Sequence, residues 1–311
     1  MAMAGIKSDR FHLGDIIRQL CHHCFMTTCI QTLGIASGLG GPVQACGYAA
    51  ELLRDEFERQ PAHAGLQLQW HMLYPEKKGL KETRLFQLYQ KASQFTCYWT
   101  ETRHPFLVIG GDHSCALGTW AGVLQGLPHS NELGLIWLDA HMDAHTFATT
   151  PSGNIHGMPV AALLGKADER LSAVYPTDRF IQPENLLLIG VRSYEAGEYA
   201  LLQQANVKII FADQISDFSQ TLLAAIEQLS STCRMIGISL DLDLIDPEDA
   251  PGVETPVPGG IKAAALLAAL AAVKRHTKLC GLEISEFNPE SDRHAKTLHL
   301  MRTVVEVFYA D

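Results

Sequence analysis

Carboxylate and imidazole side chains recur at alternate positions directly after apolar segments of this chain. They form two groups: Asp139, His141 and Asp143 after residues 133–138, and Asp241 and Asp243 after the run that begins at Met235. Alternate residues of an extended chain project from one face, so each group presents its ligand atoms together. A third apolar run, 106–109, ends in Gly110-Gly-Asp-His-Ser114. Carboxylates gathered in this way repel one another unless a cation lies among them, so the pattern predicts a metal centre.

The apolar runs that carry these groups are predicted to be strands of one α/β domain. Strands are expected at 28–35, 66–73, 106–109, 133–138, 185–189, 207–211, 235–241 and 279–284, and helical patterns at 82–99, 115–125, 214–229, 261–275 and 293–309. The central strands are almost wholly apolar, which is typical of a parallel sheet covered on both faces. The alternation predicts a single three-layer αβα domain over residues 28–311, although a closed barrel would show the same pattern. Both architectures place functional groups at the carboxyl ends of the strands, where all three clusters fall.

The composition is that of a globular protein with ample core material and an acidic balance. Of the 311 residues, 47% are hydrophobic and 19% are charged, and the formal net charge is -10. This charge argues against a nucleic-acid partner and is compatible with a cationic substrate. No apolar run reaches the length of a membrane span, and the N-terminus shows no signal-peptide core. We therefore expect a cytoplasmic protein with no membrane partner, reduced cysteines and a helical N-terminal extension over residues 1–27.

Two further patterns suggest cofactors, but each lacks part of the expected set. Cys21 and Cys24 have the spacing of half a zinc site, yet no second Cys/His pair follows at a matching interval. Gly34-Ile-Ala-Ser-Gly38-Leu-Gly40-Gly41 follows the first predicted strand, but its spacing is not that of a dinucleotide-binding loop. We favour an N-terminal helix with buried thiols for the first pattern. For the second we favour a flexible loop over the sheet edge that rims the active site.

Three motifs, in this order, resemble the metal signatures of the ureohydrolase family, which comprises arginases, agmatinases, formiminoglutamases and their relatives. The motifs are Gly110-Gly-Asp-His-Ser114, Asp139-Ala-His-Met-Asp143, and Ser239-Leu-Asp-Leu-Asp243 followed by Asp246-Pro247. The resemblance covers roughly residues 35–309. It implies an αβα sandwich around an eight-stranded, mainly parallel sheet, a centre of two Mn²⁺ ions, and a homo-trimer or homo-hexamer.

The resemblance also assigns roles to individual residues. The family's metal ligands fall on His113, Asp139, His141, Asp143, Asp241 and Asp243. Carboxylates and imidazoles without a thiolate suit a divalent ion such as Mn²⁺ better than tetrahedral zinc. In the implied mechanism a hydroxide that bridges the two metals attacks the guanidinium carbon and releases urea and an amine. His156 occupies the position of the family's proton-shuttling histidine, and Glu286 resembles the acid that grips the guanidinium.

The predicted substrate is L-arginine, cleaved to L-ornithine and urea, because residues 150–154 resemble the arginase loop that binds the α-carboxylate. The substrate-binding residues expected from this resemblance are His145, Ser152, Asn154, Glu195 and Thr255. His145 stands where arginases usually carry asparagine, and Glu195 where they carry aspartate, so both contacts would differ in reach. Thr255 can equally be interpreted as a turn residue before proline.

Other functions are compatible with parts of this pattern. A related ureohydrolase that acts on another guanidino or formimino compound would use the same centre. A catalytically silent, metal-stabilised oligomer is disfavoured because all the metal ligands, His156 and Glu286 are present. A metal-dependent deacetylase on a similar fold is disfavoured by the first two motifs and by the number of metal ligands.

Overall fold

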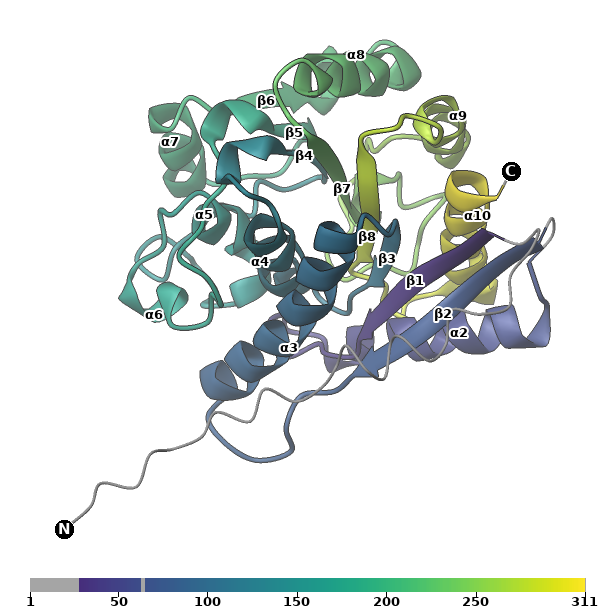
Figure 1. The fold of residues 1–311 in the computed structure, drawn as a ribbon, viewed down its shortest axis with the longest axis horizontal. Helices are drawn as coiled ribbons and strands as arrows, with labels where there is room; N and C mark the ends of the chain where they lie inside the picture. Colours follow the sequence, from purple (N-terminus) through teal and green to yellow (C-terminus); the bar gives the residue numbers. More distant parts are fainter. Residues whose placement is uncertain (1–27, 63–64, 311) are drawn as a thin grey trace.

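The computed structural model describes residues 28–62 and 65–310 and shows one open sheet of eight parallel strands (Figure 1). The strand order is β2-β1-β3-β8-β7-β4-β5-β6. The strands are β1 (Thr28–Ile35), β2 (Leu66–Leu73), β3 (Phe106–Ile109), β4 (Leu133–Leu138), β5 (Leu186–Val191), β6 (Lys208–Phe211), β7 (Met235–Asp241) and β8 (Leu279–Ser285). The expectation of an eight-stranded parallel sheet is confirmed, and the closed-barrel alternative is wrong because β2 and β6, at the two ends of this strand order, do not pair with each other.

Helices cover both faces of this sheet and complete the three layers. The α-helices are α2 (Ala49–Arg59), α3 (Lys81–Thr102), α4 (Ala116–Gly126), α5 (Pro159–Leu163), α6 (Glu169–Ser172), α7 (Ala196–Gln204), α8 (Phe218–Ser230), α9 (Ala263–Val273) and α10 (Lys296–Tyr309). Buried side chains of α2, α8, α9 and α10 belong to one core, and those of α3, α4, α5 and α7 belong to the other. The sheet therefore lies between two helical layers, as expected for an αβα sandwich (Figure 1).

The two cores explain why the central strands are apolar at every position. In β4, Leu135 and Trp137 enter one core while Ile136 and Leu138 enter the other, and all are fully buried. Successive side chains of a strand point to opposite faces, so a strand covered on both sides has no solvent-facing position. The polar residues that follow such a strand must then lie at its end, where the chain leaves the sheet.

Most predicted elements are observed, but some boundaries differ for local reasons. Helix α8 begins at Phe218 rather than 214, because the Asp217 side chain accepts a hydrogen bond from the Gln220 backbone N–H and caps the helix. The predicted helix 293–309 is interrupted: His294 and Ala295 have φ values of 59° and 54°, so the regular helix begins at Lys296. Helices α2, α5, α6 and α7 were not predicted.

Some predictions lie outside the described residues. The N-terminal extension 1–27, with Cys21 and Cys24, is among them, so its predicted helix stays a prediction. Within the described residues, no helix is long and apolar enough to cross a membrane.

Candidate metal centre and active site

The candidate site lies at the carboxyl edge of the four central strands. In the sheet the order β3-β8-β7-β4 places these strands side by side, although they are far apart in the sequence. The predicted ligands lie at the end of β7 and in the segments after β3, β4 and β7, and the segment after β8 carries Glu286. Parallel strands all end at the same edge, so one open sheet brings the motifs together.

His113 lies at the centre of the first half of this cluster. Its Nδ1 atom is 3.1 Å from Asp241 Oδ2, 3.2 Å from Asp143 Oδ2 and 3.3 Å from Asp139 Oδ2. All four residues are buried. Ligand atoms of His113, Asp139 and Asp143 lie close enough together to hold one metal ion.

His141 forms the second half with another pair of carboxylates. Its Nδ1 atom is 2.9 Å from Asp243 Oδ2 and 3.5 Å from Asp139 Oδ1. Asp139 therefore contacts both imidazoles, one with each oxygen, as a residue between two cations would. The Thr255 hydroxyl donates to Asp243 Oδ2 at 3.0 Å, so Thr255 contacts a predicted ligand in addition to preceding a proline.

The carboxylates of this cluster repel one another in the absence of a metal ion. Burial, followed by repulsion from Asp139, raises the pKa of Asp143 to about 7. Burial and repulsion from Asp243 and Asp139 raise the pKa of Asp241 well above its usual range. Burial lowers the pKa of His141, but the neighbouring Asp243 and Asp139 outweigh it and raise that pKa to about 12. Protons thus hold together a cluster that divalent cations would neutralise more directly.

The donor set and the geometry of Asp143 also fit metal ions. Asp143 Oδ2 is buried and accepts no well-directed hydrogen bond from the described residues, although His113 Nδ1 lies 3.2 Å away. Asp143 moreover has a φ of 48°, a left-handed backbone conformation that costs energy in a residue other than glycine. A buried carboxylate oxygen that faces an imidazole without a well-directed hydrogen bond, held in place by a strained backbone, is readily explained as a metal ligand. Oxygen and imidazole ligands without thiolate fit a hard to borderline divalent ion.

A second layer of hydrogen bonds orients the His113 ring. The ring Nε2 lies 3.0 Å from Ser239 Oγ, and the Ser239 hydroxyl donates to Glu283 Oε2 at 2.6 Å. The Trp120 indole N–H donates to the same Glu283 oxygen at 2.8 Å. Trp120 reaches this position because it packs against Gly237, where any Cβ would collide with the indole ring. This series of hydrogen bonds leaves His113 Nδ1 directed at the carboxylates.

The indole of Trp137 fixes the other side of the His113 ring. The two rings stack with centroids 4.1 Å apart and planes inclined by 14°. The Trp137 indole N–H donates to Asp139 Oδ2 at 2.8 Å. One aromatic side chain from β4 therefore positions an imidazole and a carboxylate of the cluster at the same time.

His156 and Glu286 meet beside the metal-type cluster. His156 Nδ1 lies 3.2 Å from Glu286 Oε1, which also accepts the His113 backbone N–H at 2.5 Å. Glu286 Oε2 is buried and has no hydrogen-bond partner among the described residues. Burial, and then repulsion from Glu254 and Asp241, raises the pKa of Glu286 well above its usual range. A carboxylate with one orphan oxygen in such a place is well suited to bind a cationic group.

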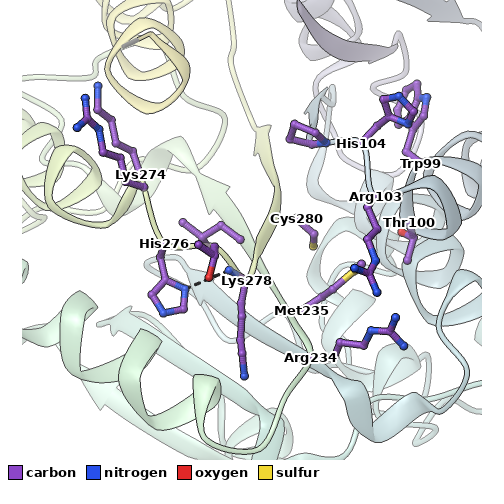
Figure 2. A pocket seen from close by; sticks show the side chains of 14 residues that line it. Trp99, Thr100, Arg103, His104, Arg234, Met235, Lys274, His276, Lys278 and Cys280 are labelled. Carbon is purple, nitrogen blue, oxygen red and sulfur yellow. Dashed lines mark hydrogen bonds between the residues drawn. The ribbon is translucent and has the colours of Figure 1, made fainter. Parts of the chain in front are cut away.

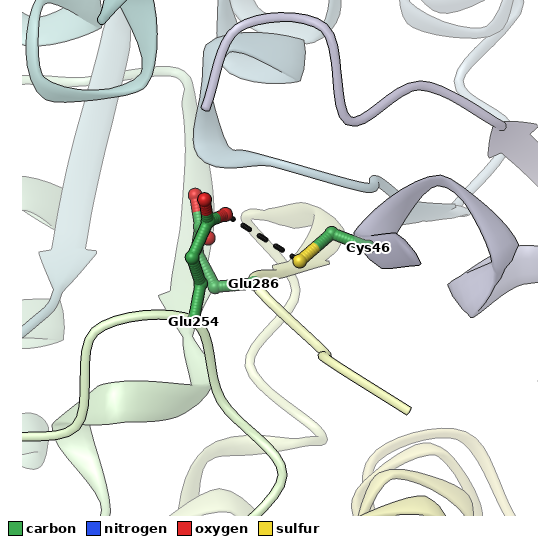
Figure 3. A group of neighbouring side chains, drawn as sticks. All are labelled: Cys46, Glu254 and Glu286. Carbon is green, nitrogen blue, oxygen red and sulfur yellow. Dashed lines mark hydrogen bonds between the residues drawn. The ribbon is translucent and has the colours of Figure 1, made fainter. Parts of the chain in front are cut away.

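Glu286 also belongs to a second cluster, with Cys46 and Glu254, which the sequence analysis did not predict (Figure 3). Glu254 accepts hydrogen bonds from the Val43 backbone N–H at 2.8 Å and from the Cys46 thiol at 3.4 Å. Burial, and then the nearby carboxylates of Glu286 and Glu254, raise the pKa of the Cys46 thiol far above its usual range, so it stays protonated. Glu254 thereby links the segment after β1 to the segment after β8.

The segment after β1 was predicted to be a flexible loop over the sheet edge. Both parts of this prediction are wrong, because hydrogen bonds hold the segment and β1 is not an edge strand. The Gly40 N–H donates to Asp112 Oδ2 at 2.9 Å, and the Gly40 carbonyl accepts from the backbone N–H groups of Ile155 and His156. Strand β1 lies inside the sheet next to the edge strand β2. The loop does rim the site, since Pro42 lines its cavity, and it holds His156 in place.

The predicted substrate residues surround a cavity of about 290 Å³ over this cluster. His141, His156 and Glu286 line the same cavity. The predicted substrate residues are His145, Ser152, Asn154, Glu195 and Thr255. His145 is buried and its Nε2 lies 3.0 Å from Glu195 Oε2. Ser152 and Glu195 are exposed at the rim, while Asn154 is half-buried.

One further acid in this cavity was missed by sequence reasoning. Glu198 is buried, lines the cavity, and lies 3.7 Å from His145 Nε2. Burial is the main cause that raises its pKa to about 7. Glu198 lies three residues after Glu195, and the two form a capping box at the start of α7. This spacing was the signal in the sequence that could have indicated Glu198.

Comparison with known proteins agrees with this geometry. The model of the "Arginase family" matches residues 53–310, so the chain belongs to the arginase family. The chain is 41% identical over 214 residues to an arginase of Brevibacillus brevis, which covers 68% of this chain and 70% of the relative.

Solved structures show the same fold. The structure of arginase from Bacillus subtilis superposes with a TM-score of 0.80 at 30% identity and covers 91% of this chain and 99% of the other. A formimidoylglutamase from the same species has a TM-score of 0.72 at 21% identity over 91% of this chain and 86% of the other, which shows a common fold.

Proposed function

We propose that the protein hydrolyses L-arginine to L-ornithine and urea with two Mn²⁺ ions. The observation that carries this proposal is the cluster around His113 and His141, in which Asp139 contacts both imidazoles. Glu286 and His156 line the cavity above this cluster. The arginases of Brevibacillus brevis and Bacillus subtilis, to which this chain is similar, support the choice of substrate.

Two sets of side chains would hold the two ions. His113 and Asp143 would hold one ion and His141 and Asp243 the other, and Asp139 and Asp241 would contribute to both sets. When bound, two such ions lower the pKa of water and supply the hydroxide nucleophile at neutral pH. Thr255 donates to Asp243 and fixes that carboxylate.

Glu286 would bind the guanidinium of the substrate. Its orphan Oε2 and its neighbour Oε1 offer the two acceptors that a planar guanidinium fork requires. The φ of 68° at Glu286 turns its side chain toward the cluster at a cost in backbone energy. The bound guanidinium would replace His156 as the partner of Glu286.

His156, once released from Glu286, would supply the proton that the leaving amine needs. A nitrogen cannot leave as an amide anion, so a positioned acid is required at this step. The backbone N–H of His156 is held by the Gly40 carbonyl at 3.2 Å, which keeps the imidazole next to the cluster after its side-chain partner has changed.

The outer part of the cavity would select the amino-acid end of the substrate. Ser152 and Asn154 are neutral donors suited to an α-carboxylate, and His145 lies beside them in the same cavity. Glu195 and Glu198 offer carboxylates to an α-ammonium. Because His145 Nε2 contacts Glu195 at 3.0 Å, the two residues would adjust together when the substrate binds.

A urea-release assay after incubation with Mn²⁺ tests this function. We expect L-arginine to exceed agmatine in kcat/KM by about 10⁴-fold or more, because donors built for the missing carboxylate would be left unpaired. Agmatine as the better substrate would favour a related ureohydrolase. Absence of urea release from arginine, agmatine and guanidino acids, and of formamide release from N-formiminoglutamate, would favour a catalytically silent protein.

The family resemblance also supports a cytoplasmic homo-trimer or homo-hexamer. Sedimentation equilibrium of the Mn²⁺-loaded protein would give the number of chains. A monomer at micromolar concentration would contradict this part of the proposal.

A further inference from the structure

A second cavity lies at the amino edge of the sheet, opposite the acid–histidine cluster (Figure 2). It has a volume of about 410 Å³ and is lined by the end of α3 and by residues at the starts of β3, β7 and β8. Seven-residue strands such as β7 span about 20 Å, so a ligand in this cavity cannot touch the substrate site. Its volume is within the range of small-molecule sites.

The lining of this cavity is strongly cationic. Its permanently charged residues are Arg103, Arg234, Lys274, Arg275 and Lys278, and none of its lining residues is acidic. The chain as a whole has a formal net charge of -10. A concentration of cations in an acidic protein produces a local positive potential that attracts anions.

Several of these cations lack a protein counter-charge. Among residues 28–62 and 65–310, the guanidinium groups of Arg103 and Arg275 have no hydrogen bond or ion pair. Arg234 differs, since its Nη1 donates to Glu132 Oε2 at 3.5 Å in an ion pair, but Glu132 lies outside the lining and the other guanidinium N–H groups of Arg234 are left for a ligand. Lys274 and Lys278 differ, since they donate to backbone carbonyls. The arginines therefore have free hydrogen-bonding capacity, and Figure 2 shows Arg103 and Arg234 on the same side of the cavity.

We propose that this cavity binds a phosphate-class oxyanion, held by the guanidinium groups of Arg103 and Arg234. A guanidinium fork matches two oxygens of a phosphoryl group, so two guanidinium groups on one side of the cavity suit an anion that carries several such oxygens. The cavity is larger than one phosphate ion, so pyrophosphate or a phosphate ester fits it better. This binding site is separate from the proposed hydrolysis of arginine.

The test measures binding of pyrophosphate to the full-length, Mn²⁺-loaded protein by equilibrium dialysis, with sodium chloride added to equal ionic strength. We expect saturable binding that is about 10-fold or more weaker in the double variant Arg103→Ala/Arg234→Ala. The double variant Lys77→Ala/Lys78→Ala removes the same charge from exposed positions beyond the carboxyl end of β2, and it should bind like the wild type.

Specific results would overturn the assignment. Equal weakening in both double variants would show a general charge effect without a site. Tighter binding of citrate than of pyrophosphate would contradict the phosphate class. Urea release serves as the folding control: the arginine variants should keep the activity of the wild type, whatever that activity proves to be. If Arg103→Ala/Arg234→Ala is misfolded by circular dichroism, the exposed Arg103→Ala alone decides, and unchanged binding by it refutes the site.

Discussion

Removing the Ser239 hydroxyl should weaken metal binding although Ser239 is not a ligand. In the structure the hydroxyl lies 3.0 Å from His113 Nε2 and donates to Glu283 at 2.6 Å. Ser239→Ala deletes both contacts and leaves a buried ring nitrogen of His113 without a partner. The imidazole then loses the hydrogen bond that keeps Nδ1 free to bind the metal.

The size of this effect follows from the number of contacts that remain. His113 keeps its stacking on Trp137, and Glu283 keeps the Trp120 indole N–H at 2.8 Å, so the site is loosened and not destroyed. Loss of such an outer hydrogen bond typically costs 10- to 100-fold in metal affinity, about 1.4–2.8 kcal/mol. The unpaired nitrogen should also lower the stability of the metal-free protein by about 1–3 kcal/mol.

Ser285 offers a matched control on the neighbouring strand. It is fully buried, it pairs in register with Asp241, and its hydroxyl has no partner among the described residues. Calorimetric titration with Mn²⁺ should show weaker binding in Ser239→Ala and wild-type binding in Ser285→Ala. Equal metal affinity in the two variants would refute the argument that the Ser239–Glu283 chain orients His113.

Four shorter predictions follow from the same geometry. Exhaustive chelation should abolish urea release and lower the melting temperature, since metal binds the native site but not the unfolded chain; full activity after chelation would refute the metal centre. Burial lowers the pKa of His113, but interactions with the neighbouring carboxylates outweigh it and raise that pKa well above its usual value. Metal binding must displace this proton, so metal affinity should weaken as pH falls. Calorimetry in buffers of different ionisation enthalpy would detect the proton release. His156→Ala should keep its metals, measured by atomic absorption, while kcat falls by about 10²–10⁴-fold, and an unchanged kcat would make His156 a loop residue only. Glu254→Ala should lower kcat because it leaves the Val43 N–H without an acceptor and loosens the loop that holds His156. Glu254→Gln can still accept this hydrogen bond and should retain most of the activity. Equal losses of activity in both variants would contradict this positioning role.

Much of the site was predictable because its ligands follow strands directly. An apolar run that is buried on both faces must end where polar residues begin, so Asp139, His141 and Asp143 could be assigned to a strand end from the sequence alone. The partner of such a residue across the sheet is harder to find. Ser239 lies opposite Glu283 only because β7 pairs with β8 in that register, and they are 44 residues apart in the chain.

The unpredicted parts depend on packing that no local pattern encodes. Trp120 reaches Glu283 because α4 lies directly over Gly237, a contact between a helix and a distant strand. Helix α7 was missed because its sequence, AGEYALLQQ, buries only Glu198 and Leu202 and so has no broad apolar face. The loop at Gly40 was predicted as flexible because glycines dominate it. Gly40 instead allows the backbone to approach Asp112 and Ser114, where a Cβ would collide.

The open parallel sheet separates the two proposed sites by both distance and charge. Acids gather at the carboxyl edge of β7 and β8, and basic side chains gather at their amino edge. The strands between them span about 20 Å, whereas the Debye length in solvent at physiological ionic strength is about 8 Å. In solvent the two edges are therefore largely screened from each other, so we expect a cationic guanidino substrate to be attracted to one edge and an oxyanion to the other. Both attractions should weaken with added salt, and neither ligand should compete with the other for binding.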